Sequence, residues 1–285
     1  MIEIPKGNYQ IGTDDQEGFP GDLERPATRI ELDSFLIDST TVTNREFLEF
    51  VRETSYVTES EKFGWSFVFH YFLDEEKKSQ SKEVPGLITW YAVPGADWRH
   101  PEGKGSTIDD RMDHPVVHVS RNDALAYCEW AGKRLPSEAE WEVAAKGGTD
   151  REKYPWGKEL LKDDQHHCNI WQGDFPKENT LEDGYANTAP VKTYEANGYG
   201  CYQMIGNVWE WCANPAKITL DHFKEKSGPE FWKEYNEVDD KAYAIKGGSF
   251  LCHKSYCKRY RIAARNGNTG MSASNNLGFR CVKDH

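Results

Sequence analysis

Hydrophobic and polar residues alternate in several short segments of the chain, which predicts β-strands there. Residues 29–33 read Arg-Ile-Glu-Leu-Asp, and the apolar run Phe-Leu-Ile follows within residues 34–37. A period of two places one set of side chains on the buried face of a sheet. A later strand is expected over residues 242–246, directly before a segment that carries two cysteines.

Capping signals predict helices at three places. Thr43 begins a capping box that Glu46 closes, and the apolar residues that follow recur on one helical face. The segments 120–132 and 137–148 each begin with serine, carry an acidic residue three positions later and end in glycine. Serine before the first turn and glycine after the last turn are typical of helix ends.

Polar connections make up much of the remaining chain. Residues 75–82 and 218–240 are highly charged, and we expect both to be surface insertions or loops. No internal repeat and no low-complexity linker divides the sequence. Because strands and helices do not alternate regularly, a doubly wound α/β fold is disfavoured. The pattern predicts a single compact α+β domain over residues 1–285, with few regular elements and long loops.

Composition and charge narrow the class of protein. The chain holds 10 Trp, 14 Tyr and 13 Phe, which distinguishes it from disordered sequences although only 38% of its residues are hydrophobic. The formal net charge of −12 argues against nucleic-acid binding, which requires a basic face. No apolar run is long enough to predict a membrane span, and the first residues do not resemble a signal peptide. The seven cysteines cannot all pair within the chain, so we expect a cytoplasmic protein with mostly reduced thiols. We also expect a monomer, because the sequence shows no heptad pattern and no obvious apolar patch.

Two cysteines five residues apart, Cys252 and Cys257, carry the strongest chemical signal. Their spacing does not match the C-x-x-C pattern, and only His253 stands nearby as a third ligand for zinc. Two thiolates without a hard ligand suit a low-coordinate soft ion such as Cu(I). The lysines and arginines around them either favour the thiolate form or make a solvated rim. Alternatively both thiols are simply buried, and the spacing alone leaves these interpretations open.

The context of this pair resembles the C-terminal signature of the formylglycine-generating enzymes. The matching strings are GGSFLCHKSYCKRYRIAAR at 247–265 and SNNLGFRC at 274–281. The resemblance covers nearly the whole chain from Ile4 onward, through residues 98–103, 113–116, 131–136, 169–173 and 206–211. The strings AGKRLP and GNVWEW alone mark a wider superfamily that includes non-catalytic paralogues and sulfoxide synthases. The paired cysteines select the oxidase branch.

The resemblance implies a C-type-lectin-like variant of an α+β fold and an enzyme that oxidises protein cysteine. Members of the family convert the cysteine of a Cys-x-Pro-x-Arg motif in sulfatases to Cα-formylglycine. They use O₂, Cu(I) and an external thiol reductant, and they release sulfide. The implied partner is an unfolded or nascent sulfatase polypeptide that binds in an extended form in a surface groove.

Roles for single residues follow from the same resemblance. The implied positions are Cys252 and Cys257 as copper ligands, Ser249 beside them, Trp209 at the oxygen pocket, and Arg265 and Asn276 in the substrate cleft. Two of these positions have a structural alternative. Trp209 could be plain core packing, and Arg265 could belong to a structural ion pair.

The resemblance also implies two calcium sites, although the sequence has no EF-hand loop. The first site comprises the side chains of Asn169 and Asp183 with the carbonyl groups of Ile170 and Tyr185. The second comprises Glu210 with the carbonyl groups of Gly206 and Val208. Oxygen ligands on long loops are what Ca²⁺ favours. The alternative is that both acids are ordinary members of a turn and of a helix end.

Three features depart from the family pattern. Trp65 stands where close relatives are expected to carry an acidic residue, and Gln203 stands where they often have asparagine. Of the two disulfides of the secreted family members, Cys128 and Cys281 match one, whereas Ala145 and Ile262 occupy the positions of the other. In a reducing cytosol we expect Cys128 and Cys281 to be packed thiols instead.

Two other functions compete with the copper oxidase. A non-catalytic binding module on the same scaffold would have no need of paired thiols beside a serine. A sulfoxide synthase would need a non-haem iron site on an added helical domain, and the sequence holds no H-x-x-x-H-x-E pattern. The sequence therefore favours the oxidase.

Overall fold

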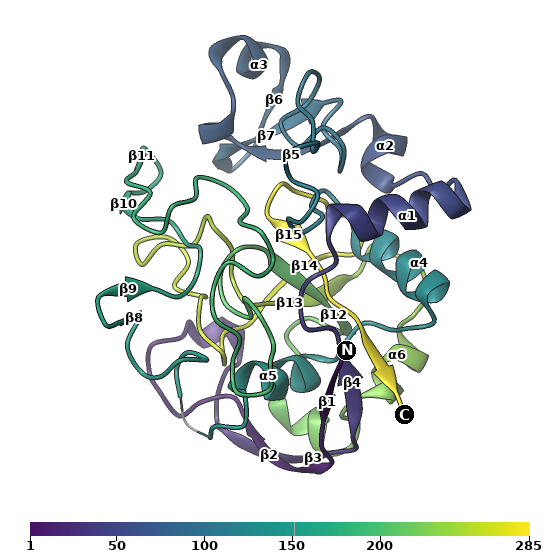
Figure 1. The fold of residues 1–285 in the computed structure, drawn as a ribbon, viewed down its shortest axis with the longest axis vertical. Coiled ribbons are helices and arrows are strands. Elements are labelled where there is room, and N and C mark those ends of the chain that lie inside the picture. The colour runs from purple at the N-terminus through teal and green to yellow at the C-terminus, as the bar shows by residue number, and fades with distance from the viewer. Residues whose placement is uncertain (151) are drawn as a thin grey trace.

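A sheet with the strand order β14-β13-β12-β15 runs through the middle of the protein in a computed structural model that describes residues 1–150 and 152–285 (Figure 1). Strand β15 runs parallel to β12, whereas the other neighbours are antiparallel. Smaller sheets surround this one in the orders β1-β4-β16, β5-β7-β6 and β2-β3. The strands are β1 (Ile2–Ile4), β2 (Gly7–Ile11), β3 (Thr28–Leu32), β4 (Phe35–Ile37), β5 (Trp65–Phe69), β6 (Lys82–Val84), β7 (Leu87–Pro94), β8 (Leu161–Lys162), β9 (Gln165–His166), β10 (Gly173–Asp174), β11 (Glu178–Asn179), β12 (Trp209–Pro215), β13 (Ala242–Lys246), β14 (Asn266–Thr269), β15 (Leu277–Gly278) and β16 (Val282–Asp284).

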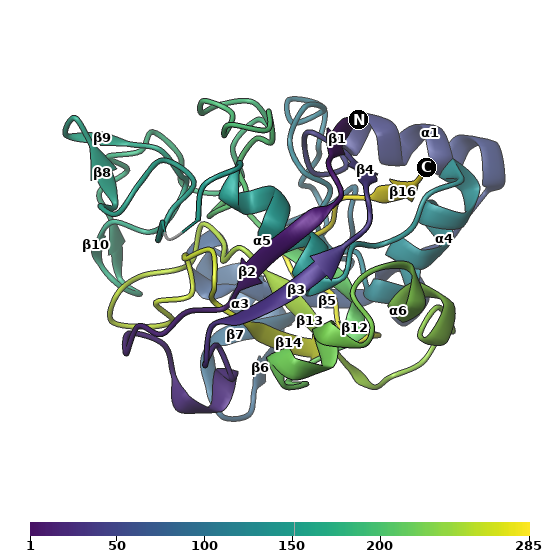
Figure 2. The same ribbon diagram turned by 90° about the horizontal axis from the view of Figure 1, so that it is seen from below.

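Helices pack around these sheets. They are α1 (Asn44–Thr54), α2 (Glu59–Phe63), α3 (Glu75–Gln80), α4 (Arg121–Ala131), α5 (Glu138–Lys146) and α6 (Pro229–Glu234), with 3₁₀ turns η1 (Pro20–Asp22), η2 (His70–Phe72) and η3 (Leu220–Lys224). The first and last strands of the chain, β1 and β16, both pair with β4, which brings the two termini to the same side of the molecule (Figure 2). The predicted strands β3, β4 and β13 and the predicted α+β class are confirmed.

The three helices signalled by capping residues form as expected. Thr43, Ser120 and Ser137 each accept a hydrogen bond from the backbone three residues later, and the acidic residue there bonds back to the cap. Helices α4 and α5 end where Gly132 and Gly147 adopt φ angles of 62° and 61°. Such left-handed backbone is accessible to glycine without a steric penalty. Local sequence therefore determines where these helices begin and end.

The two charged segments are more ordered than expected, which corrects the prediction of loops. Within residues 75–82, α3 forms because the Asp74 side chain accepts a hydrogen bond from the Lys77 amide at 2.7 Å. Within residues 218–240, η3 and α6 form because their few apolar side chains find a partner. Phe223 and Phe231 are buried, with ring centroids 5.2 Å apart. A small apolar contact thus decides the structure of a charged segment.

Large aromatic side chains fill the core. Trp98, Trp141, Trp171 and Trp211 are fully buried. The indole of Trp141, on α5, donates a hydrogen bond to Glu210 of the central sheet, and the indole of Trp211 donates one to the Val119 carbonyl. The indole N–H group of a buried Trp usually has a hydrogen-bond partner of this kind. These contacts attach the helices to the sheet that leads into the cysteine segment.

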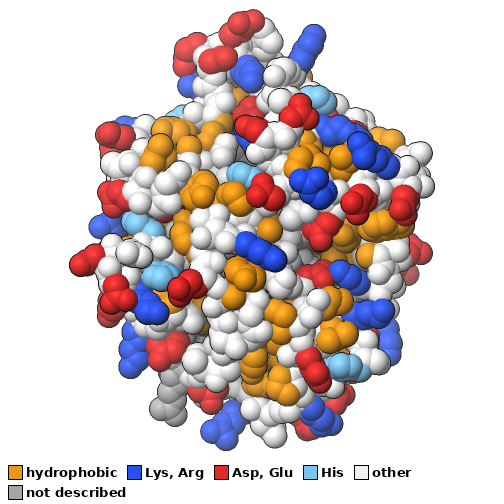
Figure 3. Space-filling model, in the orientation of Figure 1, with side chains coloured by type: hydrophobic (Ala, Val, Ile, Leu, Met, Phe, Trp, Pro, Cys, Tyr) orange, Lys and Arg blue, Asp and Glu red, His pale blue; other side chains and the backbone are white. Residues whose placement is uncertain are grey.

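The surface mixes charges of both signs. Lysine and arginine alternate with aspartate and glutamate across the face seen in Figure 3, with small apolar patches between them. In the part of the chain that the structure describes, we find no helix with the length and apolar character that a membrane crossing needs.

Candidate active site

The cysteine segment leaves β13 through two glycines. Gly247 and Gly248 adopt φ angles of 94° and 78°, a region that residues with a Cβ rarely enter. A Cβ atom on Gly248 would lie 3.1 Å from the Arg259 carbonyl oxygen and 3.3 Å from the Cys252 sulfur. These glycines let the chain turn back on itself and set the position of Cys252.

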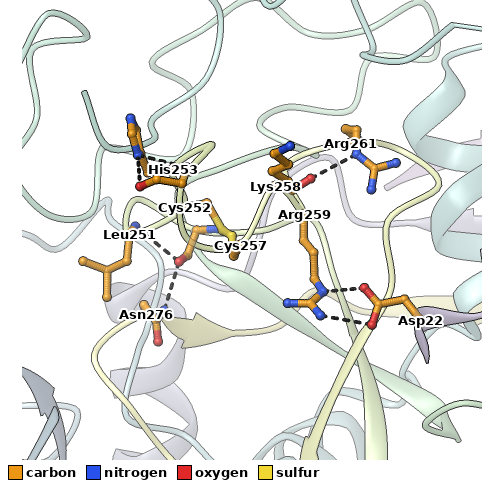
Figure 4. Close-up of a disulfide and its surroundings, with 11 residues drawn as sticks. Asp22, Leu251, Cys252, His253, Cys257, Lys258, Arg259, Arg261 and Asn276 are labelled. Carbon is orange, nitrogen blue, oxygen red and sulfur yellow. Dashed lines mark hydrogen bonds and ion pairs between the residues drawn. A yellow bond between two sulfur atoms is a disulfide. The ribbon is translucent and has the colours of Figure 1, made fainter. Parts of the chain in front are cut away.

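Cys252 and Cys257 lie together on one wall of a hollow of about 510 Å³, which we call the cysteine hollow. Their side chains come from one loop, are 2% and 6% exposed, and are joined as a disulfide (Figure 4). The two sulfur atoms therefore lie next to each other, as a shared ligand would require. The five other cysteines are free and buried. Reduction would leave two sulfur donors side by side at the hollow, a set that suits Cu(I).

Hydrogen bonds fix Ser249 beside the cysteines. Its hydroxyl oxygen accepts from Asn276 Nδ2 at 2.9 Å and from the Leu251 amide at 3.3 Å, while Asn276 Oδ1 accepts from the Ser274 hydroxyl at 2.8 Å. The Ser249 amide lies 3.4 Å from the Cys252 sulfur. Ser249, which the resemblance puts beside the cysteines, and Asn276, which it puts in the substrate cleft, both line the hollow.

Trp209 lies between the cysteine hollow and the core. The residue opens β12, lines the cysteine hollow and belongs to the main hydrophobic core, with 7% of its surface exposed. Its amide donates a hydrogen bond to the Asn276 carbonyl at 2.9 Å. Trp209 is thus a rigid apolar wall of the hollow.

Other parts of the hollow are lined by residues that the sequence analysis did not single out. Val84, Leu87 and Trp90 from the hairpin of β6 and β7 line it, together with Phe67 of β5 and Tyr256 of the cysteine loop. Leu87 is 52% exposed and Tyr256 is 45% exposed. The apolar residues around position 90 are typical of a strand. The local sequence does not indicate which site that strand lines.

Two of the cations near the cysteines are paired with acids from the N-terminal region. Arg259 binds Asp22 at 2.6 and 3.0 Å, and Arg261 binds Glu24 at 2.8 and 2.9 Å. Figure 4 shows the Arg259 guanidinium turned toward Asp22. These ion pairs compensate part of the positive charge that the sequence places beside the thiols. They also anchor the cysteine loop to η1.

Arg265 does not line the cysteine hollow, which corrects its assignment to the substrate cleft. Its guanidinium forms a buried pair with Glu138 at 2.7 and 3.0 Å and donates to the backbone carbonyls of Leu23 and Ile218. A buried guanidinium needs a carboxylate to offset its lost hydration. Arg265 is therefore a structural residue that ties α5 to the N-terminal loop.

The first implied calcium site has a suitable set of oxygens. Asn169 is fully buried, and its Oδ1 has no hydrogen-bond partner although its Nδ2 donates to the Asn187 carbonyl. The Asp183 carboxylate lies against the same loop and accepts from the Ile170 and Tyr185 amides at 3.0 Å each. Burial raises the pKa of the Asp183 carboxyl. A bound Ca²⁺ would give the buried Asn169 oxygen a partner and would neutralise the half-buried Asp183 carboxylate on the same loop.

The second implied set does not fit calcium, which corrects that assignment. The Glu210 carboxylate is buried, and Arg280 binds both of its oxygens at 2.6 and 2.8 Å. The Trp141 indole donates to the same group at 2.8 Å. The carbonyl groups of Gly206 and Val208 would therefore share a cation with a carboxylate that Arg280 already neutralises. We assign Glu210 a structural role.

Calcium is expected to stabilise the protein through Asn169 and Asp183. We expect Ca²⁺ at about a hundredfold excess over its Kd to raise Tm by about 5–10 °C. Because the folded pKa of Asp183 lies above its unfolded value, burying the ionised carboxylate costs stability as pH rises past the unfolded pKa. The rise in Tm that Ca²⁺ causes should therefore be larger at pH 7, where Asp183 is ionised, than at pH 4.

Thermal melts of matched variants check this prediction. Asn169→Ala and Asp183→Asn should lose the Ca²⁺-dependent rise in Tm, whereas Glu182→Gln, a neighbouring exposed acid, should keep it. An equal response to Ca²⁺ in all of these proteins would refute the site.

Cys128 and Cys281 behave as expected. Their sulfur atoms are 3.5 Å apart, both residues are buried, and they remain free thiols. Among residues 1–150 and 152–285, no group of three or more His, Cys, Asp or Glu side chains is arranged to hold a metal ion. Any metal at the cysteine hollow would thus rely on the two sulfurs of Cys252 and Cys257.

Paired sulfurs beside a buried serine, in an open hollow with both apolar and polar walls, are the arrangement of a protein that works through cysteine sulfur. A family model described as "Sulfatase-modifying factor enzyme 1-like domain" matches residues 1–285. The chain belongs to this family, that of the formylglycine-generating enzymes.

Curated relatives match over the full length of the chain. A formylglycine-generating enzyme of Thermomonospora curvata is 51% identical, over 100% of this chain and 93% of the relative. One of Bos taurus is 49% identical, over 100% of this chain and 75% of the relative. A second Bos taurus protein, described as "Inactive C-alpha-formylglycine-generating enzyme 2", is 42% identical, over 99% of this chain and 87% of the relative. The structure of PvdO from Pseudomonas aeruginosa matches with a TM-score of 0.69 at 21% identity, covering 99% of this chain and 93% of that one, which shows a shared fold.

Proposed function

We propose that this protein oxidises the cysteine of a Cys-x-Pro-x-Arg motif in an unfolded or nascent sulfatase to Cα-formylglycine. One observation carries the proposal: Cys252 and Cys257 lie together on the wall of an open hollow. The names of the curated relatives support the same reaction. Because the hollow is open to solvent and has both apolar side chains and hydrogen-bonding groups in its walls, it suits an extended polypeptide better than a folded surface.

Reduced Cys252 and Cys257 would hold a Cu(I) ion. When bound, this ion offers a third position to the substrate sulfur and so favours its deprotonated form. The overall change balances as follows: a CH₂SH group, O₂ and two external thiols give CHO, sulfide as H₂S, water and one disulfide. Of the four electrons that O₂ takes up, two come from the substrate and two from the external thiols.

Residues of the hollow have distinct tasks in this reaction. The oxygen of Ser249 already accepts hydrogen bonds from Asn276 and Leu251, so its own hydroxyl proton is available to a group bound in the hollow. Trp209 presents an apolar face that excludes water. Asn276 positions Ser249, and its own amide is held by Ser274.

A peptide assay tests the proposal. The protein is reduced, loaded with one equivalent of Cu(I), and incubated in air with dithiothreitol and a Cys-x-Pro-x-Arg peptide. We expect a peptide mass that corresponds to exchange of CH₂SH for CHO, and trapping of the product by an aldehyde-specific hydrazide. Addition of a strong Cu(I) chelator should stop product formation.

The alternative function is a binding module without catalysis, which the relative described as inactive brings into consideration. An unchanged peptide mass in the assay above, together with retained peptide binding, would favour that module. The paired sulfurs at the hollow favour the enzyme, because a binder gains nothing from two adjacent thiols.

A further inference from the structure

A second hollow of about 240 Å³ adjoins the cysteine hollow. We call it the aromatic groove and define it by Phe63, Trp65, Phe67 and Met271. Phe67 and Ser272 line both hollows, so the two lie next to each other on either side of these residues. A polypeptide that binds in an extended form across the cysteines therefore reaches the groove within a few residues.

The aromatic groove exposes an unusual amount of aromatic surface. Phe63 and Trp65 stack with ring centroids 6.3 Å apart, and Trp65 meets Phe67 edge to face at 4.9 Å. Phe63 is 45% exposed, and Trp65 and Met271 are each 37% exposed. All side chains that line the groove are uncharged. A contiguous patch of exposed aromatic side chains is typical of a site that binds a ligand or another protein.

Hydrogen bonds hold the groove in place before anything binds. The Ser66 hydroxyl donates to the Ala273 carbonyl at 3.0 Å, and the Asn275 amide donates to the Phe67 carbonyl at 3.0 Å. The buried imidazole of His118 lies 2.8 Å from the Ser66 hydroxyl. The wall formed by β5 is thus attached to the same segment that positions Asn276. A preformed groove binds its ligand at a lower entropic cost.

We propose that the aromatic groove binds an apolar side chain of the substrate polypeptide, a few residues from the cysteine that is oxidised. The inference rests on the proposed function, because it uses the cysteine hollow as the place of reaction. An extended chain advances about 3.3 Å per residue, so residues close in sequence to that cysteine reach the adjoining groove. Trp65 is the residue that determines the preference.

An apolar occupant suits the groove better than a charged one. An apolar side chain gains by leaving water, and an aromatic one gains further from edge and stacking contacts. An arginine would find the face of Trp65, but no carboxylate lines the groove to offset its lost hydration. An acidic side chain would meet the negative faces of the rings. The groove should therefore select Phe or Leu over Arg and over Asp.

A peptide panel tests the inference. Each position that flanks the cysteine is replaced in turn by Phe, Leu, Ala, Arg and Asp. Two quantities are measured: kcat/KM of the copper-loaded protein, and the Kd of labelled peptides with serine in place of the cysteine, by fluorescence anisotropy without copper. At one position we expect Phe or Leu to exceed Ala by about tenfold, equivalent to about 1.4 kcal/mol.

Matched variants identify the groove as the cause. Trp65→Asp should abolish the preference for Phe and Leu at that position and introduce one for Arg. Leu161→Asp adds the same charge on β8, where the exposed Leu161 lines neither hollow, and should leave the preference unchanged.

Three results would overturn the inference: a wild-type preference for Arg at that position, no apolar preference at any position, or the same profile in the Trp65→Asp variant. Failure of the proposed function looks different, because no peptide would then be oxidised. The anisotropy profile of the copper-free protein would still report whether the groove selects apolar side chains.

Discussion

Replacing Cys252 or Cys257 by alanine is expected to lower formylglycine formation by about a thousandfold or more, because a single remaining thiolate would not hold the copper ion. The two cysteines act as a unit on one wall of the hollow. The double variant should therefore be no less active than either single variant. Titration with a colorimetric Cu(I) probe should show one tightly bound ion in the wild type and none in either variant.

Cys201→Ala is the matched control for these substitutions. Cys201 is a buried free thiol that does not line the cysteine hollow, so its loss should leave copper binding and turnover in place. Full activity of the Cys252→Ala variant, with copper still bound, would rule out the assigned ligand set. Peptide binding without copper should persist in all variants, because the groove and the apolar side chains that line the hollow remain.

Replacing Arg280 by leucine is expected to lower the free energy of unfolding by about 3–5 kcal/mol. Arg280 is 0% exposed and Glu210 is 1% exposed, and two hydrogen bonds of 2.6 and 2.8 Å join them. Removing the guanidinium leaves a carboxylate inside the protein without its counter-charge. Urea unfolding of the reduced protein, followed by tryptophan fluorescence, measures the loss.

Two further variants separate this effect from simple loss of side-chain volume. Arg99→Leu breaks the half-exposed pair with Glu61 and should cost about 1 kcal/mol or less. Adding Glu210→Gln to Arg280→Leu should restore part of the lost stability, since the uncompensated charge is then gone. If the double variant were as unstable as the sum of its two single variants, the buried pair would not act as a unit.

Two corrections in the active site have a common physical reason. The sequence placed Arg265 in the substrate cleft and Glu210 in a calcium site, and the structure gives both residues a buried partner of opposite charge. Glu138 lies 127 positions from Arg265, and Arg280 lies 70 positions from Glu210. Partners so distant in sequence leave no local pattern. A motif therefore identified the residues without identifying their contacts.

The walls of the hollow show the same limit. The cysteine loop, Ser249 and Asn276 belong to strings that could be recognised in the sequence. The hairpin of β6 and β7 supplies Val84, Leu87 and Trp90 from a region that carries no such string. The aromatic groove also forms only where β5 meets the segment after residue 270. Substrate contacts thus depend on how separate segments pack.

The sequence by itself determined the family, the cysteine pair and the helices that begin at Thr43, Ser120 and Ser137, because capping residues and short motifs act over a few neighbouring positions. Only the tertiary structure decided which charges are paired and which aromatic side chains stay exposed beside the cysteines. Those outcomes depend on burial, and burial is a property of the whole folded chain.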